Sequence, residues 1–182
     1  MKEAAIPGYR LSRARRSTKV LITMAMLGLL LGLISSVSLT VSRTGLSPHS
    51  VLTYYRGEAE AGDALDALTS AATPRPFAEL VEVTHLHILG GSMLLFLLCH
   101  LLSVCDIKDE VRSFFYVTSF VSFLTTFALP WFIIYVHPAF AYLFGPAVVV
   151  FSSSLLALCL FPLREMWGRR ADRSAIWNEG RL

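Results

Sequence analysis

The largest group of residues that could do chemistry lies in one apolar stretch, 77–104. They comprise two carboxylates and three histidines, namely Glu79, Glu82, His85, His87 and His100. No Asp, Glu, Lys or Arg lies from 83 to 105, and a helix of that length spans about 35 Å at ~1.5 Å per residue. A bilayer core is about 30 Å thick, so this stretch predicts a membrane-crossing helix. Ionisable groups in such a helix are costly, which makes them functional candidates.

A helical wheel places these histidines on different sides of the predicted helix. His85 and His100 differ by about 60° at ~100° per residue and share a face. His87 differs from His100 by about 220°, so these two face apart. Glu82 and His100 are separated by whole turns and are aligned. The predicted helix therefore carries polar side chains on two sides, with His87 on one and the other groups on the opposite one.

The composition places the whole chain in a membrane. Hydrophobic residues make up 54% and charged residues 16%, and the mean hydropathy of +0.59 is typical of an integral membrane protein rather than a soluble domain. The three cysteines lie in or beside apolar segments, and no CxxCH motif occurs. This excludes covalently attached c-type haem.

The apolar runs predict an all-α polytopic membrane protein, a four-transmembrane-helix up-down bundle. The charge-free stretch 113–163 is long enough for two crossings, and His137-Pro138 is the expected break because proline cannot continue a helix. Pro130 should kink the third span and free the carbonyl of Thr126. The expected segments are a basic arm 1–19, spans 20–42, 77–105, 113–136 and 139–163, loops 43–76 and 106–112, and a tail 164–182.

The distribution of basic residues predicts the orientation. Thirteen of the sixteen Lys and Arg residues lie in 1–19, 106–112 and 164–182, flanking apolar spans. The positive-inside rule then places both termini in the cytoplasm, and we expect a bacterial inner membrane protein. The same rule explains the arginine clusters without nucleic acid, so no nucleic-acid partner is expected.

Two further features concern partners. Gly28 and Gly32 form a small-xxx-small pattern that would let another helix approach closely. In the outer loop, TYYRG (53–57) fits an interfacial anchor or a docking surface for a partner, and Leu65 and Leu68 suggest a short interfacial helix.

The histidines favour haem b as cofactor. Two axial imidazoles from facing helices are required, and His87 or His85 on the second span with His137 on the third would supply them, His87 and His137 being the preferred metal ligands. Glu82 would serve as a hydrogen-bonding partner or proton relay. His100 finds no second histidine at its level in the other spans, and it could instead hydrogen-bond a quinone.

Other chemistries are weaker. The spacing of Glu82 and His85 is the Glu-x-x-His of di-iron bundles, but such sites need a second copy that the other spans do not carry. No nucleophile has an acidic partner nearby, and no catalytic residues are predicted.

The pattern of His85 or His87, His100 and His137 on four spans resembles that of the small four-helix membrane cytochromes b. The resemblance implies electron transfer from quinol through haem b to a periplasmic redox partner. The alternative is a non-catalytic accessory or assembly subunit of a larger membrane complex, with structural histidines.

Overall fold

Four apolar runs of the sequence form four long helices in the computed structural model, which describes residues 11–57 and 74–168. Each is long and apolar enough to cross a membrane. No strand occurs in the described ranges, so the prediction of an all-α four-helix membrane protein is confirmed. The elements are η1 (Leu11–Arg13), α1 (Arg16–Arg43), α2 (Pro48–Arg56), α3 (Phe77–Ser103), α4 (Asp109–Tyr135), η3 (Pro138–Phe140) and α5 (Ala141–Trp167). The helix suggested near Leu65 and the ends 1–10 and 169–182 lie outside the described residues.

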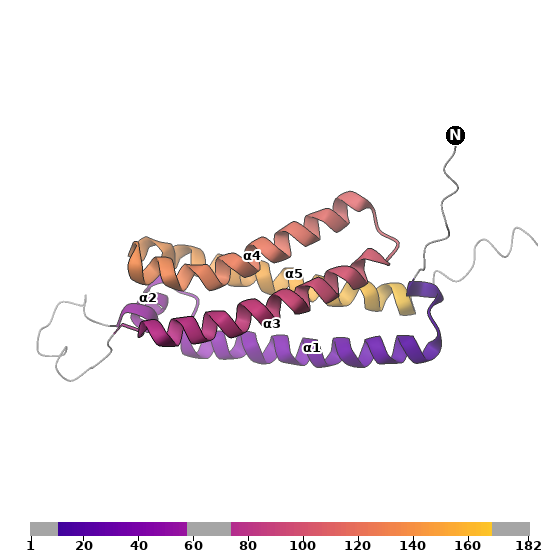
Figure 1. The fold of residues 1–182 in the computed structure, drawn as a ribbon, viewed down its shortest axis with the longest axis horizontal. Coiled ribbons are helices and arrows are strands. Elements are labelled where there is room, and N and C mark those ends of the chain that lie inside the picture. Colours follow the sequence, from indigo (N-terminus) through magenta and orange to yellow (C-terminus); the bar gives the residue numbers. More distant parts are fainter. Residues whose placement is uncertain (1–10, 58–73, 169–182) are drawn as a thin grey trace, which may run out of the picture.

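The long helices run alternately up and down, as Figure 1 shows. Helix α5 packs against all three of the others, and α3 packs chiefly against α4 and α5. Helix α1 lies along α5 and has a single buried residue among those described, Met26. The bundle is thus a three-helix core with a fourth helix at its side.

Two apolar clusters hold the core together. The larger one joins α3, α4 and α5 around Leu95, Leu98, Phe123 and Leu158, all at most 2% exposed. The smaller one joins α2, α4 and α5 around Val51 and Ile133, at the end of the bundle that carries α2. This end is called the α2 end below.

Helix α2 was not predicted from the sequence. Ser47 caps its start, because the side chain accepts a hydrogen bond from the backbone N–H of Ser50, and Pro48 occupies the first turn. Gly57 ends it with a φ of 78°, which a residue without Cβ adopts freely. The Ser-Pro pair before an apolar Val-Leu was the local signal for this helix.

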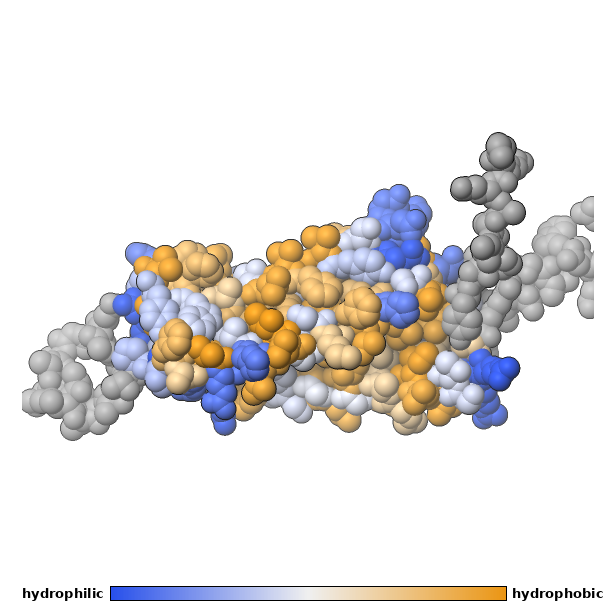
Figure 2. Space-filling model, in the orientation of Figure 1, coloured by the Kyte–Doolittle hydropathy of each residue, from blue (hydrophilic) through white to orange (hydrophobic). Residues whose placement is uncertain are grey.

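The surface matches a membrane protein. Figure 2 shows hydrophobic side chains over the middle of the molecule and hydrophilic ones concentrated toward its two ends. Hydrophilic surface also interrupts the apolar face over α3.

Candidate functional site: a pocket between α1 and α3

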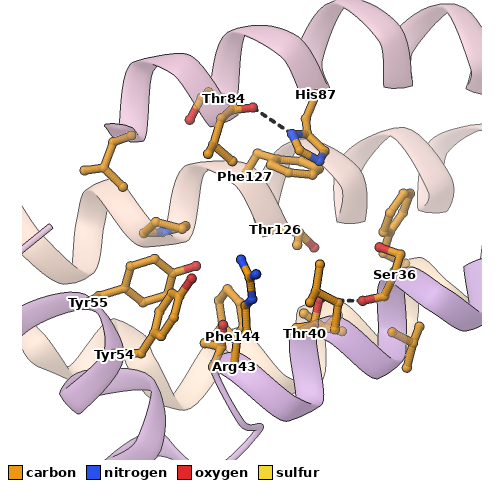
Figure 3. Close-up of a pocket in the computed structure, with 18 of the residues that line it drawn as sticks. Ser36, Thr40, Arg43, Tyr54, Tyr55, Thr84, His87, Thr126, Phe127 and Phe144 are labelled. Carbon is orange, nitrogen blue, oxygen red and sulfur yellow. Dashed lines mark hydrogen bonds between the residues drawn. The ribbon is translucent and has the colours of Figure 1, made fainter. Parts of the chain in front are cut away.

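The main candidate site is a pocket at the α2 end, called the α1–α3 pocket here. Its volume is about 380 Å³, and all five α-helices contribute to its wall. Figure 3 shows polar side chains reaching into it from α1, α2, α3 and α4. Those that bear on the chemistry are Ser36, Thr40, Arg43, Tyr54, Tyr55, Arg75, Glu79, Thr84, His87 and Thr126. Apolar side chains such as Leu33, Val83, Phe127 and Val148 form much of the remaining wall.

His87 is the one predicted histidine that reaches this pocket. Its ring stacks on Phe127 of α4, with 4.7 Å between ring centroids. Nδ1 lies 2.7 Å from the carbonyl oxygen of Val83, one turn earlier in α3. A carbonyl only accepts hydrogen bonds, so Nδ1 carries the proton in the neutral ring. Nε2 therefore keeps its lone pair and can accept a proton or bind a metal.

Arg43 brings a positive charge to the same pocket from the last turn of α1. Figure 3 shows its side chain extended into the pocket, with the guanidinium between the two tyrosines of α2 and Thr126. Sequence reasoning treated Arg43 as a loop residue and missed it. A signal was present, because Arg43 is the first charge after an apolar run and its long side chain can turn back along the helix.

Arg75 fixes the mouth of the pocket. Its guanidinium lies 4.0 Å from the ring centroid of Tyr54 and forms an ion pair with Glu79. Its backbone N–H donates to the carbonyl oxygen of Tyr55 at 3.1 Å. Together these contacts tie the start of α3 to the end of α2.

Tyr55 lies beneath this clamp and packs edge-on against Phe144. Burial raises the pKa of its hydroxyl above the ordinary value, and the neighbouring Tyr54 acts in the same direction. The Tyr55 hydroxyl is therefore protonated at neutral pH and can donate a hydrogen bond. The TYYRG segment thus builds the pocket wall, whatever else it contacts.

His137, the predicted second ligand, has a different task. It precedes η3 and its Nδ1 accepts a hydrogen bond from the backbone N–H of Ala139 at 3.1 Å. Nδ1 is therefore unprotonated, and the neutral ring carries its proton on Nε2. This is the opposite tautomer to that of His87.

The structure does not bring His87 and His137 together. His87 is level with Phe127, and His137 lies ten residues further along the chain, about 15 Å at ~1.5 Å per residue of helix. His137 does not line the pocket. Within the described ranges no group of three or more His, Cys, Asp or Glu side chains lies together that could hold a metal ion.

Glu82, His85 and His100 face away from the bundle. The buried residues of α3 include Leu80, Leu95, Leu98 and Leu102, and on a wheel Glu82 and His100 lie on the opposite side. All three ionisable side chains are exposed. In the described part of the chain, none of these three side chains has a hydrogen-bonding or ionic partner. The ring of His100 stacks on Phe96.

The fold defines the class of protein, an integral membrane protein of four spanning helices. More specifically, the chain belongs to the Aq_1264_TM family, described as a transmembrane helical domain, whose family model matches residues 45–173. The match takes in α2 to α5 and leaves α1 outside. No curated protein and no solved structure matches the chain. These findings support a small membrane protein and show no resemblance to the cytochromes b.

Proposed function

We propose that this chain is a membrane electron-transfer subunit and that its α1–α3 pocket binds a quinol. The observation that supports this most directly is the hydrogen bond between His87 Nδ1 and the Val83 carbonyl. It leaves Nε2 as an acceptor among apolar walls, which suits the hydroxyl of a lipid-soluble ring.

The pocket offers complementary groups for the two oxygens of a quinol. Nε2 of His87 accepts a hydrogen bond from one hydroxyl, and Arg43 or Tyr55 donates to the other oxygen. Oxidation of a quinol releases two protons and two electrons. His87 would take one proton and the second would leave to water at the α2 end. The two electrons would leave one at a time to an acceptor at the outer face, either a haem b or a redox partner.

Binding can be measured through Trp131. Its indole N–H donates to Thr84 Oγ1 at 3.0 Å, and Thr84 lines the pocket. With Trp167→Phe and Trp177→Phe in place, Trp131 is the sole tryptophan of the chain. Titration with decylubiquinol, kept reduced, in detergent micelles should then give saturable quenching of its fluorescence.

Matched histidine variants test the assignment. His87→Ala should weaken binding about tenfold, as expected for one lost hydrogen bond of roughly 1.4 kcal/mol. His85→Ala is the control, because it lies two residues away on the other side of α3. Quenching that never saturates in the parent, or equal losses in both variants, would refute the quinol site.

The orientation of the subunit is part of the proposal. Both termini lie in the cytoplasm of a bacterial inner membrane, which puts the α2 end and the pocket on the periplasmic side. A periplasm-active reporter fused after Leu182 should be silent, and one inserted at Gly62 should be active. The reverse pattern contradicts this orientation.

A second candidate function is an accessory or assembly subunit of a larger membrane complex. The observation that favours it is the open surface of α1: a Cβ added at Gly28 or Gly32 would meet no atom within 4 Å. A helix of another protein could approach this side of α1 closely. Extraction in a mild detergent followed by crosslinking should recover such a complex, and a monomer without co-purifying protein would argue against it.

A further inference from the structure

The α1–α3 pocket is open between the two helices for which it is named. Among the described residues of its wall, the exposed ones belong to these two helices, with Ser36, Leu39 and Arg43 on α1 and Val83 and His87 on α3. Helix α1 packs along α5 and hardly touches α3. We call this opening the α1–α3 gap. Figure 3 shows His87 on one side of the pocket and Ser36 and Arg43 on the other.

The gap extends into the apolar part of the membrane. Arg43 is the last residue of α1 and marks the border of the bilayer core. Ser36 and Leu33, which both line the pocket, lie about 10 and 15 Å deeper at ~1.5 Å per residue. The hydrocarbon core is about 30 Å thick, so the gap reaches to about its middle. Leu39 and Val83, which are 51% and 46% exposed, give it apolar edges.

The other sides of the pocket do not suit an apolar chain. Pro130 of α4 and Phe144 and Val148 of α5 line it and are buried in the bundle. At the α2 end lies the ion pair of Arg75 with Glu79, and covering these charges with an apolar chain would cost their hydration. An apolar substituent of a bound molecule therefore leaves the pocket through the α1–α3 gap.

A quinol of the membrane needs such an exit, because its ring carries a long isoprenoid chain beside the two hydroxyls. The pocket volume of about 380 Å³ is near the lower end of the roughly 300–1,000 Å³ of small-molecule sites. It has room for the ring but not for the chain. With the ring hydrogen-bonded to His87 and to Arg43 or Tyr55, the chain lies in the gap and continues into the surrounding lipid.

We propose that the substrate is a quinol with a long apolar chain, that it enters the pocket from the bilayer through the α1–α3 gap, and that its chain stays bound there. Leu33 and Ser36 of α1 and Val83 of α3 are the residues that contact the chain. This inference rests on the quinol site proposed above and adds the class of substrate and the seat of its chain. It also gives a task in binding to α1, which lies outside the family match at 45–173.

Two ligands with the same ring separate the chain from the headgroup. Decylubiquinol carries an alkyl chain and ubiquinol-0 carries none, and both are kept reduced and titrated against the full chain with Trp131 as its sole tryptophan. Concentrations are counted within the micelle phase, so that partitioning into detergent is not counted as binding. Decylubiquinol should bind at least about tenfold more tightly, because its chain contacts the gap. Equal affinities would overturn the proposal.

Two serines of α1 form a matched pair that locates the chain. Ser36→Phe fills the gap and should weaken decylubiquinol binding about tenfold while leaving ubiquinol-0 binding unchanged. Ser38→Phe is the control, because Ser38 is exposed, does not line the pocket and lies about 200° around the helix from Ser36. Equal losses in the two variants, or a loss in Ser36→Phe that is the same for both ligands, would overturn the proposal.

Two leucines of α1 test the same seat by removing contacts instead of adding bulk. Leu33→Ala should weaken decylubiquinol binding about threefold, since apolar surface that covers the chain is lost, and ubiquinol-0 binding should not change. Leu31→Ala is the control, because Leu31 is 67% exposed and does not line the pocket. A Leu33→Ala variant that binds decylubiquinol as tightly as the parent would count against the seat.

The outcomes separate this inference from the quinol site itself. If neither quinol gives saturable quenching, the quinol site and the chain seat fail together. If decylubiquinol saturates and His87→Ala weakens it, but Ser36→Phe and Leu33→Ala do not, the quinol site stands and the chain seat is wrong. If phospholipid added to the micelles displaces decylubiquinol at a comparable mole fraction, the gap is a general lipid contact and the chain seat is again wrong.

Discussion

The two sides of α3 treat their polar groups differently. On the inner side, Thr84 accepts a hydrogen bond from Trp131, and His87 donates to Val83 and stacks on Phe127. On the outward side, Glu82 and His85 have no such partner within the described residues. These four α3 residues lie within six consecutive positions, 82–87.

Polar side chains on the inner side of α3 find hydrogen-bonding partners within the chain, and those on the outward side do not. Thr84 and Trp131 are both partly buried, and a buried polar group without a partner costs roughly 1–3 kcal/mol. Their hydrogen bond therefore contributes to the stability of one chain. Substitutions there should change the unfolding of the monomer, and substitutions on the outward side should change it little.

The largest change in the free energy of unfolding is expected at Gly91, and its neighbour Gly90 is the matched control. A Cβ at Gly91 would overlap the ring of Phe123, which is only 2% exposed, whereas a Cβ at Gly90 would meet nothing within 4 Å. Gly91→Ala should therefore cost about 1–3 kcal/mol through overpacking. Gly90→Ala should keep or raise stability by about 0.5 kcal/mol, since alanine favours helix. Unfolding in mixed micelles titrated with SDS measures both, and equal effects would contradict this difference.

A smaller effect is expected at the inner hydrogen bond. Thr84→Val preserves shape but leaves the Trp131 indole N–H without its acceptor. Hydrogen bonds between membrane helices average about 0.6 kcal/mol, and we expect a loss of that size in the same unfolding assay. Thr84→Ser, which keeps the hydroxyl, should lose less. A Thr84→Val variant as stable as the parent would show that this contact adds nothing.

The smallest effect on the folded monomer is expected on the outward side. Leu89→Ala removes a side chain that is 63% exposed, so monomer unfolding should change by less than about 0.5 kcal/mol. A large loss of monomer stability would mean that Leu89 packs within its own chain.

The sequence alone determined the class and the number of spans. Apolar runs of more than twenty residues are expected to cross the bilayer as helices. A single segment can form all its backbone hydrogen bonds in the bilayer core only as an α-helix. The wheel also separated His87 from His85 and His100, since angles along one helix follow from its period. The sequence did not reveal α2 or the position of Arg43 in the pocket, because both depend on how the connection after α1 folds back.

Only the tertiary structure decided which side of α3 is the inner one and how the helices are aligned along their axes. Packing of Phe123 on Gly91 and Trp131 on Thr84 sets that alignment, which puts His87 beside Phe127 and leaves His137 about 15 Å away. The tautomers of the two histidines depend on local backbone partners, Val83 for His87 and Ala139 for His137. A sequence fixes angles and lengths within each helix, but the depth and rotation of one helix against another come from side-chain packing.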